Sequence, residues 1–251
     1  MTIVLKVGGS LITDKTGAEV VDHDQLSRVC TILSEHAPAN CILVHGGGSF
    51  GHHAANAHNV STTTGTRDPA AIRDVMHAMD RLRGTVVDEL QEAGVPAVPV
   101  PTRALATKDQ DGDVTLAPHV VAQALAEDFI PVLHGDIVIH TQHGATILSG
   151  DTLAIALARA LDCERIGLCA AVPGVLDAQG EVVPAITSFA DVAPLFSETR
   201  GTDVSGGMAA KVQALLGVEV PGAIFGIEAL ASFLNGELPG TQVHPVDTDP
   251  F

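Results

Sequence analysis

Short apolar runs alternate with longer segments of helical periodicity along most of the chain. The runs are rich in Val, Ile and Leu, which is typical of strands that are buried on both faces of a sheet. A hairpin is expected at residues 137–148, around 142–144. The other strands are expected at residues 2–7, 41–45, 95–100, 129–133, 165–171 and 222–225. Strands that alternate with helices predict an α/β fold with a mainly parallel sheet.

The segments between these runs carry the signals of amphipathic helices. Asp68 and Pro69 open the clearest one, which continues to about Ala93 with apolar residues three or four positions apart. Asp22 or Asp24 can cap another helix, which runs to about residue 36. Further helices are expected near residues 51–59, 116–128, 151–161, 207–216 and 228–234.

Glycines follow directly after two of the predicted strands. Residues 6–10 read KVGGS, with Lys15 close behind, and residues 45–52 read HGGGSFGH. Glycine lets backbone N–H groups approach an anion closely, so each loop suits a phosphate, and a plain strand-to-loop turn is an equal alternative for the first. The carboxyl ends of parallel strands share one edge of a sheet. Both loops are therefore expected at one site, which suits a reaction between two phosphate-bearing molecules.

The second loop also matches the pattern G-x-G-x-x-G, at Gly46, Gly48 and Gly51. A dinucleotide site would need an acidic residue about 20 positions later, at the end of the next strand. Residues 61–66 lie in that region, and they are polar and not strand-like. The loop does not end in G-K-[ST], so it is not a P-loop either.

Two further motifs precede predicted helices. In the sequence SGD at 149–151, Asp151 can be a helix N-cap or can orient lysines that hold a phosphoryl group. Residues 202–208 read TDVSGGM, and Lys211 follows one turn later. A Gly-Gly pair that opens a helix suits anion binding, and the alternative is a flexible surface loop.

Charge adds a second line of argument. The chain has a net charge of −17 and only four lysines, of which Lys6, Lys15 and Lys211 fall inside motifs while Lys108 does not. We therefore expect turnover to need the three motif lysines and to depend little on Lys108. Abundant carboxylates and scarce lysine favour adaptation to high salt, as in a haloarchaeal protein, over an ordinary acidic bacterial enzyme.

The acidic composition argues against nucleic acid or an anionic membrane as a partner. The N-terminal residues do not resemble a signal peptide, and no apolar stretch approaches the roughly 20 residues of a membrane span. We therefore expect a cytoplasmic protein. The four cysteines form no C-x-x-C pair and the twelve histidines no zinc-binding spacing, so no protein-bound metal is predicted.

Taken in order, KVGGS, the triple glycine, SGD and the DVSGGM…Lys211 segment resemble the amino acid kinase superfamily over about residues 1–216. Within it, Phe50 and His52 make the second loop similar to that of the isopentenyl phosphate kinase family. The resemblance implies a three-layer α/β/α sandwich with a mainly parallel central sheet, and a homodimer. It also implies an acceptor-substrate lobe at 1–161 and a nucleotide-binding lobe at 162–251, with the boundary near Leu161.

The resemblance further implies ATP-dependent phosphorylation of isopentenyl phosphate to isopentenyl diphosphate, in isoprenoid biosynthesis by the mevalonate pathway, with ATP and Mg²⁺. The residues expected to be catalytic are Lys6, Lys15, His52, Asp151 and Lys211. Those expected at the nucleotide are Lys6, Gly8, Gly9, Ser10, Lys15, Gly174, Gly206, Gly207 and Lys211. Those expected at the acceptor are Gly46, Gly47, Gly48, Gly51, His52 and Gly150.

One position departs from the family pattern. Members usually carry an aspartate near the glycine at the position of Gly174, and here Ala171 replaces it. This puts a contact on the nucleotide side in doubt. It also supports one alternative that stays open, a non-catalytic nucleotide-binding protein. A second alternative is a related kinase for another phosphate or phosphonate, of the fosfomycin type, because its scaffold and histidine would look alike.

Overall fold

A twisted eight-stranded sheet runs through the molecule, which is described here by a computed structural model over residues 2–14, 16–197 and 207–244. The strand order is β10-β12-β11-β9-β1-β2-β6-β3; the six strands from β11 to β3 are parallel, and β12 and β10 run the opposite way. The strands are β1 (Ile3–Val7), β2 (Cys41–His45), β3 (Ala97–Pro99), β6 (Ile130–His134), β9 (Arg165–Ala170), β10 (Ala185–Ile186), β11 (Gly222–Gly226) and β12 (Thr241–Val243). The predicted mainly parallel sheet is confirmed.

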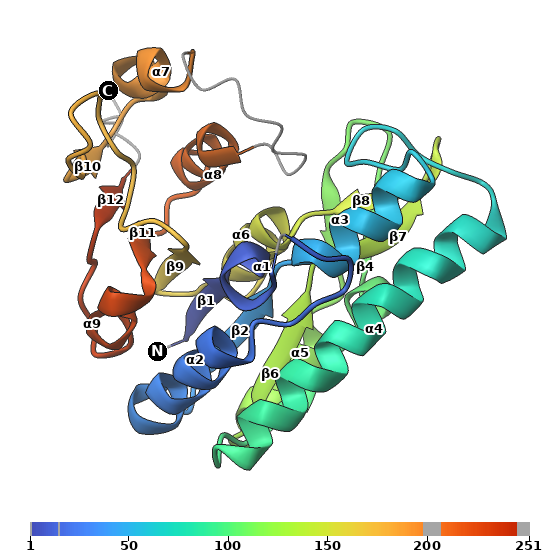
Figure 1. Ribbon diagram of the computed structural model, residues 1–251, viewed down its shortest axis with the longest axis horizontal. Helices are drawn as coiled ribbons and strands as arrows, with labels where there is room; N and C mark the ends of the chain where they lie inside the picture. The colour runs from blue at the N-terminus through green and yellow to red at the C-terminus, as the bar shows by residue number, and fades with distance from the viewer. Residues whose placement is uncertain (1, 15, 198–206, 245–251) are drawn as a thin grey trace.

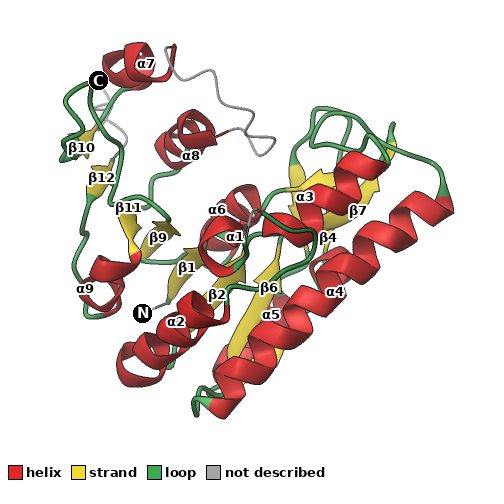
Figure 2. Cartoon of the chain, in the orientation of Figure 1, coloured by secondary structure: helices red, strands yellow, loops and turns green. Residues whose placement is uncertain are grey.

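Helices cover both faces of this sheet, as Figure 2 shows, so the expected three-layer arrangement is also confirmed. One face carries α2 (His23–His36), α4 (Pro69–Glu92) and α9 (Leu230–Leu234), and the other carries α5 (His119–Ala126), α6 (Gly150–Ala160) and α8 (Gly207–Leu216). The remaining helices are α1 (Gly9–Ile12), α3 (Gly48–Ala57), α7 (Phe189–Ser197) and the 3₁₀ turns η1 (Thr102–Ala104) and η2 (Ile227–Ala229).

Local signals explain where the two longest helices begin. The side chain of Asp22 accepts a hydrogen bond from Gln25 N, and that of Asp68 accepts one from Ala70 N. Pro69 occupies the first turn of α4, where its missing N–H costs nothing. The cap predicted at Asp68 is therefore confirmed, and of the two candidates Asp22 and Asp24 the cap is Asp22.

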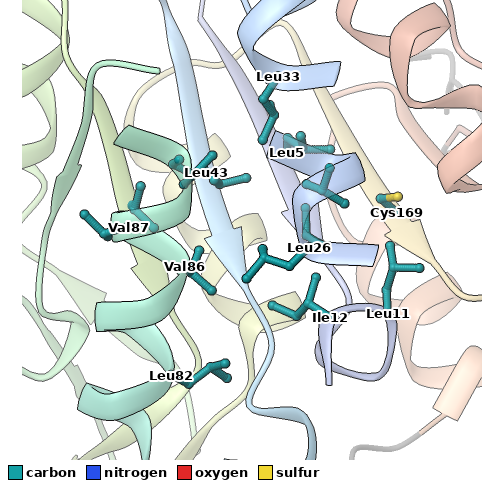
Figure 3. Close-up of a cluster of buried hydrophobic side chains, with 14 of the residues drawn as sticks. Leu5, Leu11, Ile12, Leu26, Leu33, Leu43, Leu82, Val86, Val87 and Cys169 are labelled. Atoms are coloured by element: carbon teal, nitrogen blue, oxygen red, sulfur yellow. The ribbon is translucent and has the colours of Figure 1, made fainter. Parts of the chain in front are cut away.

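Two hydrophobic clusters fill the spaces on either side of the sheet. Figure 3 shows the one beneath α2 and α4, where Leu26 and Leu33 meet Leu5 and Leu43 of the central strands. The other contains residues of the opposite strand faces and of α6, such as Leu153. Because alternate strand residues enter opposite clusters, the central strands read as continuous apolar runs.

A smaller sheet lies beside the main one, with strand order β5-β4-β7-β8. Its strands are β4 (Ala106–Lys108), β5 (Val114–Leu116), β7 (Asp136–His140) and β8 (Gly144–Leu148). The predicted hairpin at 137–148 is confirmed as β7–β8. The short elements α1, β4, β5, β10 and β12 were not predicted, because they carry too few residues for a periodic signal. Helix α3 also begins at Gly48, three residues before the expected start.

Candidate active site

The carboxyl ends of three neighbouring parallel strands meet at one cavity of about 780 Å³. Glycines follow β1, β2 and β6, and Figure 1 shows helices α1, α3 and α6 gathered around these strand ends. The predicted site residues that line the cavity are Lys6, Gly8, Gly9, Ser10, Gly46, Gly47, Gly48, Gly51, His52, Gly150, Asp151 and Lys211. The two loops expected at one edge of the sheet therefore do lie together.

The first two glycine loops touch backbone to backbone. A Cβ atom at Gly9 would lie 2.2 Å from Gly48 N, and one at Gly46 would lie 2.5 Å from Gly9 N. No side chain fits at such a distance, so glycine is required at both positions. Thr13 joins the same contact, because its hydroxyl donates to Gly9 O and accepts from Ser49 N. The close contact fixes the two loops relative to each other.

Besides the short α1, two longer helices start at the cavity. Helix α3 begins at Gly48 and α6 begins at Gly150, so the free N–H groups of their first turns lie at the cavity wall. The N-cap of α6 is Ser149, whose hydroxyl accepts from Thr152 N. This settles the alternative left open for Asp151: it is not the cap, and its carboxylate is available for other contacts.

Asp151 joins two lysines that are far apart in the sequence. Its Oδ1 lies 2.7 Å from Lys6 Nζ and its Oδ2 lies 3.2 Å from Lys211 Nζ, and all three side chains are largely buried. Burial alone would raise the pKa of Asp151, but the charges and hydrogen bonds of the two lysines outweigh it and lower that pKa. The carboxylate is thus charged, and it holds two ammonium groups side by side at the cavity.

Two buried histidines stand directly behind the glycine loops. His45 ends β2 and His134 ends β6, they are register partners, and their ring centroids are 5.3 Å apart. Each Nδ1 contacts the carbonyl oxygen of the following glycine, at 3.1 Å for Gly46 and 3.0 Å for Gly135. Since a carbonyl oxygen only accepts, each Nδ1 carries the proton. The two imidazoles therefore fix the orientation of two peptide groups at the cavity.

Both of these rings are uncharged near neutral pH. Burial, together with the neighbouring His134, lowers the pKa of His45 to about 3. Burial also lowers the pKa of His134, although Asp136 and the Gly135 carbonyl oppose that shift. Neutral rings add hydrogen bonds without adding charge, so His45 and His134 do not add to the positive charge that the lysines bring to the cavity.

Another side of the cavity is apolar. Ala55, Val60, Val75, Met79 and Ile147 line it, from α3, α4, β8 and the turn after α3. The sulfur of Met79 lies 3.2 Å from where a Cβ of Gly47 would be, so the apolar wall begins directly at the triple glycine. One cavity thus combines groups that bind anions with a surface suited to a hydrocarbon.

Asp136 is a second buried carboxylate at the cavity, and it was not predicted as a site residue. Arg103 donates to it at 2.8 Å and also pairs with Asp80 of α4. Burial raises the pKa of Asp136, against the opposing effects of His134 and Arg103. Across residues 2–14, 16–197 and 207–244, no three His, Cys, Asp or Glu side chains gather to bind a metal ion.

Of the remaining predicted residues, Gly174 and Gly207 do not line the cavity. Lys15 and Gly206 lie outside the described residues. Gly207 opens α8, one turn before Lys211. Gly174 is buried against β12, where a Cβ would lie 2.7 Å from Thr241 Oγ1. Ala171 is exposed after β9, so it brings no charge to the strand end. Their roles stay predictions.

Sequence reasoning also missed part of the lining. Residues 16–18, 60–62, Gly135 and Ile147 all face the cavity. Gly135 could have been found, because it follows a buried strand just as the other two glycine loops do. The turn at 60–62 and the apolar side chains of β8, Ile147 and Leu148, carry no local signal of this kind.

Comparison with known proteins agrees with this geometry. A family model described as amino acid kinase family matches residues 1–219. The isopentenyl phosphate kinase of Haloferax volcanii is 46% identical over 242 residues, which are 96% of this chain and 98% of that protein. The chain belongs to the isopentenyl phosphate kinase family, within the amino acid kinase family. The isopentenyl phosphate kinase of Methanothermobacter thermautotrophicus is 30% identical, and the alignment covers 95% of this chain and 92% of that protein.

Solved structures of this family share the fold. One, described as X-ray structures of isopentenyl phosphate kinase, has a TM-score of 0.83 at 25% identity. The match covers 97% of this chain and the whole of that chain. The product complex of the Thermoplasma acidophilum isopentenyl phosphate kinase, at 22% identity, has a TM-score of 0.72 over the same share of this chain. Among the described residues, no helix is both long enough and apolar enough to cross a membrane.

Proposed function

We propose that this chain transfers the γ-phosphoryl group of ATP to isopentenyl phosphate and releases isopentenyl diphosphate and ADP, a step of isoprenoid biosynthesis. The observation that carries the proposal is the composition of the cavity. Glycine N–H groups and two lysines gather at one side, and an apolar wall begins where the triple glycine ends. An acceptor with a phosphate head and a short hydrocarbon tail matches both surfaces.

The acceptor needs little activation. A phosphate monoester has its second pKa near about 6, so most of it is doubly ionised at neutral pH. One of its oxygens can attack the γ-phosphorus of ATP while the bond from that phosphorus to the β,γ-bridging oxygen breaks, and ADP leaves. No proton has to be removed first, so no general base is required. Catalysis then rests on position and on charge neutralisation.

The buried ion-pair cluster supplies that neutralisation. Lys6 and Lys211 would hold the nucleotide phosphates and the transferred group, with Asp151 fixing where their ammonium groups lie. Lys15, Gly8, Gly9, Ser10, Gly174, Gly206 and Gly207 complete the proposed nucleotide side. Because the lysines are already desolvated and oriented, they can stabilise the charge that develops on the transferred group.

The acceptor phosphate would lie against Gly46, Gly47, Gly48 and Gly51, at the start of α3. His52 lies one turn inside α3 and lines the cavity, so its imidazole can donate a hydrogen bond to that phosphate. Gly150 would approach from the start of α6. The imidazoles of His45 and His134 hold the Gly46 and Gly135 carbonyls behind this site.

Mg²⁺ would arrive with ATP as part of the substrate. The carboxylates that line the cavity are Asp136 and Asp151, and each is already paired with a cation. The residues described at the cavity therefore do not build a protein-held magnesium site. Phosphate oxygens would hold the ion, which would lower the negative charge that the lysines have to offset.

The wider setting of the protein is also part of this proposal. We infer a cytoplasmic homodimer with small-molecule substrates and without nucleic acid, adapted to high salt. We further infer that residues 1–161 carry the acceptor and residues 162–251 the nucleotide, with β9 and β1 as neighbours at the boundary. The net charge of −17 and the haloarchaeal relative support the salt adaptation.

A phosphotransfer assay tests the activity. ATP and Mg²⁺ are supplied with isopentenyl phosphate, dimethylallyl phosphate, fosfomycin, N-acetylglutamate or free amino acids, and ADP release is followed for each. We expect the highest kcat/KM with isopentenyl phosphate. Preference for fosfomycin would replace the proposed acceptor, and ATP binding without turnover of any acceptor would indicate a non-catalytic nucleotide-binding protein.

A further inference from the structure

Lys108 is a buried lysine whose described partners are all uncharged. It ends β4, is 7% exposed, and its Nζ lies 2.9 Å from Thr62 O and 3.4 Å from Ile147 O. Within the described parts of the chain, no carboxylate forms an ion pair with it. Burial lowers the pKa of Lys108, with no opposing charge. A cation in this setting carries a desolvation cost, so its contacts matter to the fold or to the site.

The two carbonyls belong to segments that form one wall of the cavity. Thr62 lies in the turn that follows α3, and Ile147 lies on β8; both line the cavity. The same turn bonds to β8 through Ile147 N and Ser61 O, at 2.9 Å, and through a pair of bonds between Thr66 and Ala145. Lys108 approaches from a third segment, β4, and joins the turn to β8.

This wall stands at the far end of the cavity from the triple glycine. Helix α3 starts at Gly48 and has 10 residues, which corresponds to a rise of about 15 Å before the chain reaches the turn. Val60 and Ile147 present apolar groups there. In Figure 1 the small sheet that carries Lys108 lies beside α3. An acceptor with its phosphate at Gly47 would point its tail toward this wall.

An ordinary packing role for Lys108 predicts a different side chain. An apolar residue could fill the space beneath β8, and the turn would then keep only its backbone bonds. The ammonium group adds donors that reach two carbonyl oxygens on two segments at once. Its effect is therefore on the position of the turn relative to β8, which decides how far the cavity extends.

We propose that Lys108 is a positioning residue that limits the length of the acceptor tail, by holding the 61–64 turn against β8 at the end of the cavity. The proposal rests on the proposed function, since it assumes a phosphate with a hydrocarbon tail. It adds a role for the lysine that stands outside every glycine motif. Lys108 does not touch the reacting atoms, so kcat with a short acceptor should change little.

The test compares wild type with Lys108→Met, which keeps an unbranched side chain as far as the ε position and removes the ammonium group. Acceptors of five and ten carbons, isopentenyl phosphate and geranyl phosphate, are each assayed with ATP. We expect the ratio of kcat/KM for geranyl phosphate over isopentenyl phosphate to rise at least tenfold. We expect kcat with isopentenyl phosphate and KM for ATP to stay within about twofold, because the nucleotide and the glycine loops are untouched.

A matched control uses another cation that bonds a carbonyl of the same hairpin. Arg67 donates to Gln142 O at the exposed tip, away from the cavity wall. Arg67→Met should leave the selectivity ratio at the wild-type value. An equal ratio in wild type and a folded Lys108→Met would overturn the proposal, and so would an equal rise in both variants.

Hydrogen exchange gives a second, assay-independent measurement. In Lys108→Met, the amides of Thr66 and Ile147, which bond across the turn and β8, should exchange faster, while those of β1 and β2 should not. If Lys108→Met does not fold, Lys108→Gln keeps a donor and should show a smaller shift in the same direction. If wild type transfers phosphate to neither acceptor, the proposed function is refuted. The exchange data would still show whether Lys108 holds the 61–64 turn against β8. Unchanged exchange in Lys108→Met would refute that positioning role.

Discussion

The two ends of the cavity use lysine in opposite ways. At the glycine end, Lys6 and Lys211 share the carboxylate of Asp151, so two cations sit beside one buried anion. At the far end, Lys108 meets only carbonyl oxygens among its described partners, those of Thr62 and Ile147, and both of these residues line the cavity. The first arrangement leaves a surplus of positive charge facing the cavity, whereas the second uses the charge to hold backbone in place.

This difference separates chemistry from selection. A surplus of positive charge stabilises a transferred phosphoryl group, and a fixed apolar wall discriminates between tails. Substitutions at the glycine end should therefore lower kcat, and substitutions at the far end should change which acceptors are accepted. The expected effects are largest at the glycine end.

Loss of either paired lysine should have the largest effect on turnover. Lys6→Met or Lys211→Met is expected to lower kcat by about 10²–10³-fold, because each removes a cation that stabilises the transition state. Steady-state kinetics with saturating ATP and isopentenyl phosphate measure this, with Arg28→Met, at an exposed ion pair with Glu228, as the control. A folded Lys6→Met with near-normal kcat would remove the distinction between the two ends.

His52 should show the next largest effect. His52→Ala is expected to lower kcat/KM for isopentenyl phosphate by roughly 10²-fold, the scale for loss of one transition-state donor, with KM for ATP nearly unchanged. His52→Gln should restore part of the activity, since its amide is still a donor. The more exposed His53 should give a much smaller loss when replaced by alanine. Wild-type kcat/KM in His52→Ala would exclude the acceptor role.

A change of pH should affect the stability of the glycine end through its buried histidines. Unfolded histidine binds a proton near pH 6.5, while folded His45 binds one only near pH 3. The unfolded state thus binds more protons between these values, and the free energy of unfolding falls as pH drops below about 6.5. Each such histidine contributes a slope of up to about 1.4 kcal/mol per pH unit.

The variant His45→Asn removes the imidazole that binds the proton and keeps a hydrogen-bond donor for the Gly46 carbonyl. Urea unfolding at pH 7, 6 and 5 should show a shallower loss of stability in this variant than in wild type. The charge of Asp136 and the ion pairs around it are common to both proteins, so they cancel in the comparison. Parallel stability profiles would mean that His45 binds its proton equally in the folded and unfolded states, and that its pKa is not lowered by folding.

Salt should produce the smallest effect. The carboxylates that give the chain its net charge of −17 repel one another, and molar KCl screens that repulsion. The melting temperature is expected to rise by several degrees between low and molar KCl, measured by calorimetry. The ion pairs at Asp151 are buried and less exposed to screening, so they should not reverse the trend. A flat or falling melting temperature would argue against salt adaptation.

The sequence by itself determined the parallel strands, the glycine loops at their ends and the caps of the long helices. These features depend on residues that are close together in the chain, such as Asp68 before Pro69, or on the apolar run that precedes Gly46. Signals of this kind can be read without knowledge of the fold. Most of the site residues predicted from these signals, from Lys6 to Asp151, do line the cavity.

Only the tertiary structure decided which side chains share a contact. The sequence left Asp151 undecided between a helix cap and an orienting carboxylate, and the fold gave the cap to Ser149 and brought Lys211 to Asp151. It likewise placed Lys108 against Thr62. Contacts between distant segments depend on how strands and helices pack, and local sequence patterns do not predict that packing.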